Sequence, residues 1–221
     1  MSKRILVWDV PTRVFHWLLV LSFTGAFLTA ESERTRDIHV LLGYIMLGLL
    51  AFRLLWGFIG TRYARFGSFL FRPGEIVAYL KSLVERKPAH YVGHNPAGSM
   101  AIWLLLILGV ASCVSGVMVY EEVGGDVLEE IHDVVSYAML AVVAVHVFGV
   151  LLSSLLHREN LVLSMITGLK SDGQNAGIKR SYAWLGVIML VAVVAFSFGY
   201  PAIGQVSSGP GAAHALQNDK D

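Results

Sequence analysis

The sequence has little charge and only one cysteine. Asp, Glu, Lys and Arg make up 15% of its 221 residues, whereas a soluble domain usually has about 25%. The net charge of +1 gives no reason to expect a nucleic-acid partner. Cys113 is the single cysteine, which excludes an internal disulfide, a zinc-finger cluster and a covalently attached c-type haem.

Apolar residues are abundant instead, at 55% of the chain. They form five long runs, at about 14–30, 38–60, 98–119, 131–156 and 182–200. A helix needs ~20 residues, at a rise of ~1.5 Å each, to cross a bilayer. The sequence therefore predicts an all-α membrane protein with five spans.

Basic residues lie mostly on one side of the predicted spans. Thirteen Lys and Arg residues fall in the N-terminal segment and in the 61–97 and 157–181 connections, against three in 31–37, 120–130 and the tail after 200. The side rich in Lys and Arg is normally cytoplasmic. We therefore predict a cytoplasmic N-terminus and a C-terminus on the outer side.

Two segments outside the spans have a recognisable character. Pro73 can begin a helix, and apolar residues then recur every three or four positions to Val84. This predicts an amphipathic helix over 73–86, lying on the cytoplasmic membrane surface or packed against the protein. The 201–221 tail is rich in Gly, Ser and Ala, which predicts a flexible segment.

Four histidines fall within the predicted spans. His16 is near the start of the first span, His39 begins the second, and His132 and His146 both lie in the fourth. A histidine in hydrocarbon is costly and usually functional. His132 and His146 are 14 residues apart in the sequence. This is nearly four helical turns, so the two side chains should share one face, about 21 Å apart along the axis.

The predicted orientation pairs these histidines by depth. His39 and His132 belong to the outer half of the membrane, and His16 and His146 to the inner half. Two imidazoles at one depth, from two helices, can serve as the axial ligands of a six-coordinate haem. We therefore predict a four-helix transmembrane bundle holding two haems b. Proton relay or helix–helix hydrogen bonding is the alternative, while zinc is disfavoured because its ligands cluster at one depth.

Arg53 and two glycines would complete such sites. Arg53 follows His39 by 14 residues and should lie ~21 Å deeper. There it either pairs with a propionate of the inner haem or extends to the cytoplasmic interface. Gly43 and Gly149 follow His39 and His146 closely. Each would let a flat ring approach the backbone, or else simply let helices pack closely.

These residues, with several short segments, resemble the bacterial cytochrome b561 and nickel–iron hydrogenase cytochrome b superfamily, which is related to the gamma subunit of formate dehydrogenase. The matching segments are 7–17, 52–57, 64–66, 93–98 and 157–161, together with His39, Gly43, Tyr44, His132 and His146. The resemblance covers about 1–170. It implies an inner-membrane, respiratory-chain protein with two haems b on these histidine pairs and electron exchange with quinone.

The resemblance also indicates a quinone site. In the formate dehydrogenase relative, quinone lies beside the cytoplasmic-side haem, next to an asparagine and a glycine before the third helix. Asn95 and Gly98 occupy the corresponding positions. The residues themselves also fit a helix start, with Asn95 as the cap and Pro96 as the first residue. One asparagine can serve both purposes.

The chain departs from the family in its last part. Residues 171–200 add a linker and a fifth span that contains no histidine. This helix either faces lipid, docks a partner subunit or forms part of a homo-oligomer interface.

We interpret the chain as a dihaem cytochrome that carries electrons between quinone and a periplasmic partner, such as a c-type cytochrome or a hydrogenase-like subunit. The segment 120–130, with five acids and no basic residue, could attract a basic partner. His94, His157 and Glu159 are candidate proton carriers, although we expect the histidines of connections to face solvent. The alternatives are a superoxide:quinone oxidoreductase, with only Arg34 and Arg36 to attract its substrate, and a haem-free transporter or assembly subunit.

Overall fold

A computed structural model describes residues 4–85, 89–171 and 177–207, with side chains as far as Tyr200. The predictions for the basic residues Lys3, Arg86, Lys87 and Lys220, and for the tail beyond Ser207, lie outside these residues.

Among the described residues, five long helices are apolar enough to span a membrane, as predicted. They are α1 (Val10–Thr29), α2 (Arg36–Ile59), α4 (Pro96–Tyr120), α5 (Gly125–His157) and α7 (Ala183–Ser207). Two of them begin at side-chain caps. Asp9 accepts a hydrogen bond from the Thr12 N–H at 2.7 Å, and Asn95 accepts one from the Gly98 N–H at 2.7 Å. These caps satisfy backbone donors that the first helical turn leaves unpaired.

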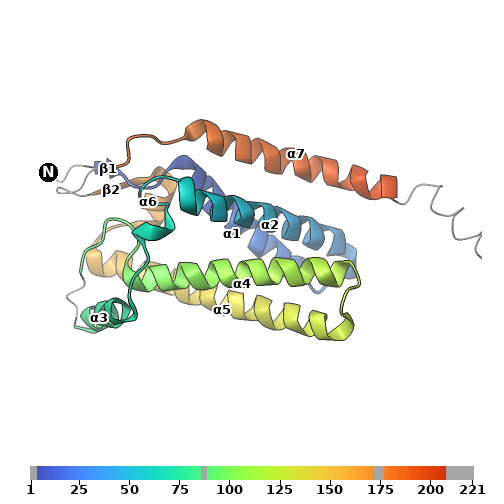
Figure 1. Cartoon of the computed structure of the whole chain (residues 1–221), viewed down its shortest axis with the longest axis horizontal. Coiled ribbons are helices and arrows are strands. Elements are labelled where there is room, and N and C mark those ends of the chain that lie inside the picture. Colours follow the sequence, from blue (N-terminus) through green and yellow to red (C-terminus); the bar gives the residue numbers. More distant parts are fainter. Residues whose placement is uncertain (1–3, 86–88, 172–176, 208–221) are drawn as a thin grey trace, which may run out of the picture.

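α1, α2, α4 and α5 form an antiparallel bundle, and α7 runs in the same direction as α1 (Figure 1). α1 packs on α2, α2 on α4 and α4 on α5. α4 therefore lies between α2 and α5. α1 and α5 are not among the closely packed pairs of described elements. α7 lies along α1, and the Val10 N–H donates to the Ser181 carbonyl at 2.9 Å just before α7 begins.

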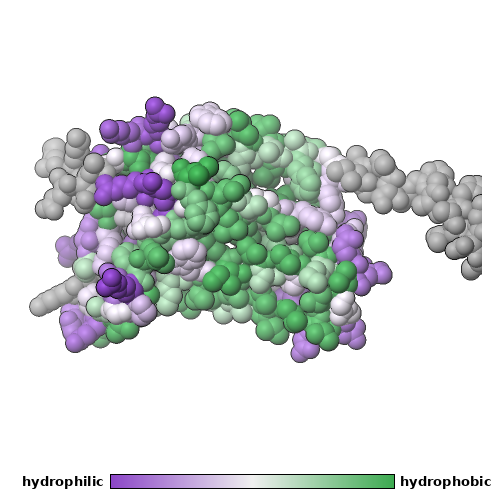
Figure 2. All heavy atoms as spheres, in the orientation of Figure 1, coloured by the Kyte–Doolittle hydropathy of each residue, from purple (hydrophilic) through white to green (hydrophobic). Residues whose placement is uncertain are grey.

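Apolar side chains form a broad band across the middle of the face shown in Figure 2, with polar residues at both ends. Each long helix contributes large exposed apolar side chains: Leu28, Phe58, Ile107, Phe148 and Val191 are all at least 60% exposed. Soluble proteins rarely expose apolar area on this scale. The band has the character of a lipid-facing surface.

The two ends of the bundle carry different elements. One end, called the turn end below, carries the α1–α2 connection, with the short 3-10 helix η1 (Glu33–Thr35), and the α4–α5 connection. The α3 end, at the left of Figure 1, carries α3 (Pro73–Val84), α6 (Leu161–Thr167), a second 3-10 helix η2 (Phe66–Ser68) and two short strands. These strands, β1 (Arg4–Leu6) and β2 (Leu169–Ser171), pair antiparallel with Ile5 opposite Lys170.

The predicted amphipathic helix is present as α3, and it packs against α4. Tyr79 is its one buried residue, at 3% exposure, while Val77 and Val84 are 65% and 84% exposed. The helix therefore has one side held by the protein and an apolar side that is open. The strands and α6 had no counterpart in the sequence predictions.

Candidate functional site

Two of the predicted histidines face each other near the turn end. The rings of His39 on α2 and His132 on α5 have their centroids 6.2 Å apart and their planes at 85°. Metal–imidazole bonds are about 2 Å long, so two rings that bind one metal ion from opposite sides have centroids about 6 Å apart. The observed spacing matches this value.

Both rings are held in the orientation that ligation requires. His39 donates from Nδ1 to the Ala26 carbonyl at 2.8 Å, and His132 donates from Nδ1 to the Ser112 carbonyl at 3.0 Å. A carbonyl oxygen can only accept, which assigns the proton to Nδ1 and leaves the Nε2 lone pair available. Metal-bound histidines are commonly fixed by such a hydrogen bond.

Gly116 on α4 makes room for the His132 ring. A Cβ at this position would lie 2.9 Å from Cε1 of His132, which is closer than such atoms approach one another. The close contact between α4 and α5 thus depends on a missing side chain directly behind a candidate ligand.

The second predicted pair lies nearer the α3 end. His16 on α1 and His146 on α5 are close enough for a charge on one to act on the other. The Nδ1 atom of His16 is buried and has no hydrogen-bond partner among the described residues. Trp17 packs edge-on to the His16 ring at 5.1 Å between centroids.

Arg53 is buried instead of reaching the interface. Only 4% of it is exposed, and its guanidinium lies over the rings of Phe66 and Phe69 at 5.1 and 5.7 Å. Its Nη1 atom is buried with no hydrogen-bond partner within the part of the chain that the structure describes. Because the side chain is buried, the alternative in which Arg53 extends to the interface is wrong. The charge of the Asp9 carboxylate acts on Arg53, and a second anionic group facing Nη1 would be favourable for a buried guanidinium.

His94 was expected to face solvent, and this expectation is also wrong. Its ring packs between Trp8 and Phe69, with centroids 4.6 and 4.7 Å away. Burial, assisted by the nearby charges of Arg53 and Lys170, lowers the pKa of His94 to about 3. The ring is therefore neutral, and its Nδ1 has no partner among the described residues.

Unpaired polar atoms thus gather around one end of the bundle. Nδ1 of His16 and His94, Nη1 of Arg53 and Nε1 of Trp103 are all buried without a partner in the described chain. Such atoms are rare in folded proteins and call for an explanation. A bound group that carries carboxylates, as haem does, would give the Arg53 guanidinium an acceptor. Haem would supply one-electron redox chemistry there, with His16 and His146 as ligands and Arg53 facing an acidic substituent.

The predicted quinone residues do form a helix start. Asn95 caps α4 through its side-chain oxygen, and Pro96 is the first helical residue. A Cβ on Gly98 would lie 3.2 Å from the Asn95 oxygen, so the two residues are in direct contact. The Asn95 amide nitrogen is not used by the cap.

A helical membrane bundle with paired, oriented imidazoles has the architecture of a membrane cytochrome. The family model described as prokaryotic cytochrome b561 matches residues 7–168, and the chain belongs to this family. It is accordingly a multi-pass inner-membrane cytochrome that carries haem b and takes part in electron transfer.

Individual relatives agree with this assignment. A probable Ni/Fe-hydrogenase B-type cytochrome subunit of Azotobacter vinelandii is 25% identical, with 76% of this chain and 88% of the relative covered. A probable Ni/Fe-hydrogenase 1 B-type cytochrome subunit of Escherichia coli K12 is 29% identical, with 52% and 60% covered. No solved structure matches the chain.

Proposed function

We propose that the chain is a dihaem cytochrome b that carries electrons across the membrane between quinone and a periplasmic redox partner. His39 and His132 hold the outer haem, and His16 and His146 hold the inner one. The facing imidazoles of His39 and His132, 6.2 Å apart with both Nδ1 atoms tied to carbonyls, carry this proposal. Axial ligation of one haem needs this spacing and an available Nε2 on each ring.

The α3 end faces the cytoplasm in this proposal. It contains most of the basic residues, whereas the turn end contains the acidic segment 120–130. A Cys113→Ser background allows single cysteines to be placed at Gly67 and at the exposed Asp126. A membrane-impermeant maleimide added to intact spheroplasts should label the cysteine at 126 and leave the one at 67 unlabelled.

The inner haem exchanges electrons with quinone. Arg53 pairs with a propionate of this haem, which gives its unpaired Nη1 an acceptor. Asn95 and Gly98 lie at the start of α4, and the amide nitrogen of Asn95, which the helix cap does not use, can donate to a quinone carbonyl. A neutral His94 next to Asn95 adds a second polar group at this position.

The outer haem meets the redox partner. The five acids of segment 120–130 are all exposed in the structure: Glu121, Glu122, Asp126, Glu129 and Glu130. A surface whose charges all have the same sign attracts an oppositely charged partner and makes the association rate depend on salt concentration. The names of the relatives point to a hydrogenase, and the acidic surface equally suits a basic c-type cytochrome.

Proteoliposomes that contain the purified protein test the proposal. A membrane-soluble quinol should reduce both haems under anaerobic conditions, and a basic c-type cytochrome added at the turn end should then reoxidise them. Raising the salt concentration should slow the second step and not the first. Haem that stays oxidised with excess quinol would rule out the quinone function, and reoxidation that is insensitive to salt would rule out the acidic docking surface.

A further inference from the structure

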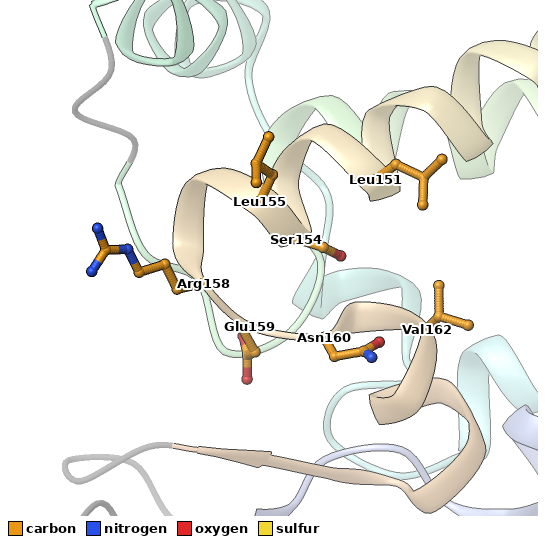
Figure 3. A pocket seen from close by; sticks show the side chains of 7 residues that line it. All are labelled: Leu151, Ser154, Leu155, Arg158, Glu159, Asn160 and Val162. Carbon is orange, nitrogen blue, oxygen red and sulfur yellow. The ribbon is translucent and has the colours of Figure 1, made fainter.

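Two hollows adjoin each other at the α3 end, on the exposed surface of α5 and α6. The first, called the apolar hollow below, has a volume of about 450 Å³ and lies over Leu151, Leu155 and Val162 (Figure 3). The second, called the polar hollow, has a volume of about 330 Å³ and lies between the end of α5, α6 and the two strands. Residues 158–160 line both hollows, so the two form one continuous surface.

Polarity changes along α5 from one hollow to the other. Leu151 and Leu155 lie on successive turns of the helix and are 57% and 75% exposed. Arg158 follows at the end of α5, about 10 Å beyond Leu151 along the axis, and its side chain extends outward (Figure 3). The apolar hollow therefore lies toward the apolar band, and the polar hollow lies at the edge of the band. A phospholipid has the same order, since its acyl chains lie in the hydrocarbon and its headgroup at the membrane surface.

Positive charge predominates in the polar hollow. Arg4, Arg158 and Lys170 line it, against the single carboxylate of Glu159. This carboxylate is turned toward β2 (Figure 3), where it pairs with the buried Lys170 at 3.3 Å and accepts from the Ser171 N–H at 3.3 Å. Because Glu159 and Lys170 compensate each other, the two arginines give the polar hollow a net positive charge. Guanidinium groups are suited to bind a phosphate through two parallel hydrogen bonds.

Asn160 adds an uncharged donor where the two hollows meet. Its side-chain oxygen caps α6 by accepting from the Leu163 N–H at 2.8 Å. The cap does not use the amide nitrogen, which carries two N–H donors. An N–H group beside an arginine can donate to a phosphate oxygen that the guanidinium does not bind.

The backbone of Arg158 is in an unusual conformation. Its φ is 52° and its ψ is 35°, which is the left-handed conformation that ends α5. Glycine usually occupies this position in a helix end, because a Cβ makes the conformation unfavourable. Backbone strain of this kind is concentrated at sites that bind ligands. The strain therefore marks Arg158 as a residue whose side chain has a function at this position.

From these observations, we propose that the two hollows together bind one anionic glycerophospholipid of the leaflet at the α3 end. Its phosphate pairs with Arg158 and Arg4 and accepts from the Asn160 amide, while an acyl chain lies along Leu151 and Leu155. The positive charge favours a lipid with net negative charge over a zwitterionic one. The apolar hollow favours a lipid over free phosphate, which has no apolar part to bury. This inference does not depend on the haems or on quinone.

Native mass spectrometry of the delipidated full-length protein measures the affinity of the first bound lipid. We expect dioleoylphosphatidylglycerol to bind about tenfold more tightly than dioleoylphosphatidylcholine, and Arg158→Gln to weaken its binding about fivefold. Leu155→Asn should weaken the binding of both lipids. Arg65→Gln and Leu28→Asn are the matched controls, because both residues are exposed and line neither hollow. Both should bind lipid as wild type does.

Arg158→Gly separates lipid binding from folding. Glycine adopts the left-handed conformation without strain, so the midpoint of thermal unfolding in lipid-free detergent should be no lower than that of wild type. Added phosphatidylglycerol should raise the midpoint of wild type and leave that of Arg158→Gly unchanged. Inorganic phosphate should raise neither midpoint more than chloride does at the same ionic strength.

Equal affinities of wild type for the two lipids would overturn the proposal, as would wild-type affinity for phosphatidylglycerol in Arg158→Gln and Arg158→Gly. Specific stabilisation or displacement of the lipid by inorganic phosphate would show a free-phosphate site instead. If wild type self-associates, and Arg158→Gln and Leu155→Asn abolish the association without changing lipid affinity, the hollows form a contact between two copies of the chain and the proposal is wrong.

Discussion

Gly116 of α4 lies directly behind the ring of His132, so that a Cβ at this position would be 2.9 Å from Cε1 of the ring. The ring cannot easily move away from Gly116, because its Nδ1 donates a hydrogen bond to the Ser112 carbonyl. We predict that Gly116→Val displaces His132 and removes the outer haem, which lowers the haem content per chain by about half. Gly48→Val is the control, since a Cβ there meets nothing within 4 Å.

Substitutions at Gly43 test where the outer haem lies. A Cβ on Gly43 or on Gly48 would contact no protein atom, although both are on α2. Gly43 follows His39 by about one turn, and a macrocycle held by His39 would cover it. Gly43→Leu should therefore lower haem content strongly, while Gly48→Leu should not. Equal haem contents in the two variants, measured as pyridine haemochrome, would place the haem elsewhere.

Arg53 should influence the redox potential of the inner haem alone. Its buried positive charge stabilises the reduced, more negative form of a neighbouring haem. Arg53→Met keeps the size and packing against Phe66 and Phe69 and removes the charge. We expect the midpoint potential of the inner haem to fall by roughly 60 mV, which is a tenfold change for a one-electron couple. A redox titration should show the outer haem unchanged, and an equal fall in both potentials would argue against a local pairing.

Much of this arrangement follows from the sequence. The apolar runs located all five spans. The largest deviations are that α7 ends seven residues later than expected, α5 begins six residues earlier and α1 begins four residues earlier. In α1 the helix starts at the Asp9 cap with Pro11 in its first turn, a signal that was present in the sequence. The spacing of His132 and His146 depends only on helix geometry, so their shared face was predictable.

Other features depend on contacts between distant segments. The strands have only three residues each, and their pairing joins positions about 165 residues apart. The burial of His94 requires Trp8 and Phe69 to close over it from two other segments. Neither leaves a periodic pattern in the sequence. The carbonyl partners of His39 and His132 come from neighbouring helices and were likewise not predictable.

Asp9 should be a major contributor to stability. It is 1% exposed and accepts hydrogen bonds from the Thr12 N–H, from Trp56 Nε1 at 3.1 Å and from Thr61 Oγ1 at 2.5 Å. Asp9→Ala removes a helix cap and leaves buried donors unpaired, which should cost about 2–4 kcal/mol. Thermal unfolding in detergent should show a clearly lower midpoint, whereas the exposed Asp37→Ala should be close to wild type. Similar midpoints in both variants would contradict this role.

His94 should make the fold less stable in acid. Its pKa is about 3 in the folded protein and 6.5 in the free side chain. Between these values the unfolded chain binds a proton that the folded chain does not, so stability should fall as the pH drops from about 6.5. The slope should reach at most about 1.4 kcal/mol per pH unit. His94→Gln should flatten the decline in unfolding midpoint between pH 7 and pH 5, and the exposed His90→Gln should not.

The central claim is that two histidine pairs hold two haems b in one chain. The most direct test is the haem-to-protein ratio of the purified protein, by pyridine haemochrome and amino-acid analysis, for wild type, His132→Ala and His146→Ala. We predict two haems in wild type and one in each variant, with a different low-spin signal lost from the electron paramagnetic resonance spectrum in each case. A wild-type ratio of one, or variants that lose the same signal, would contradict the account.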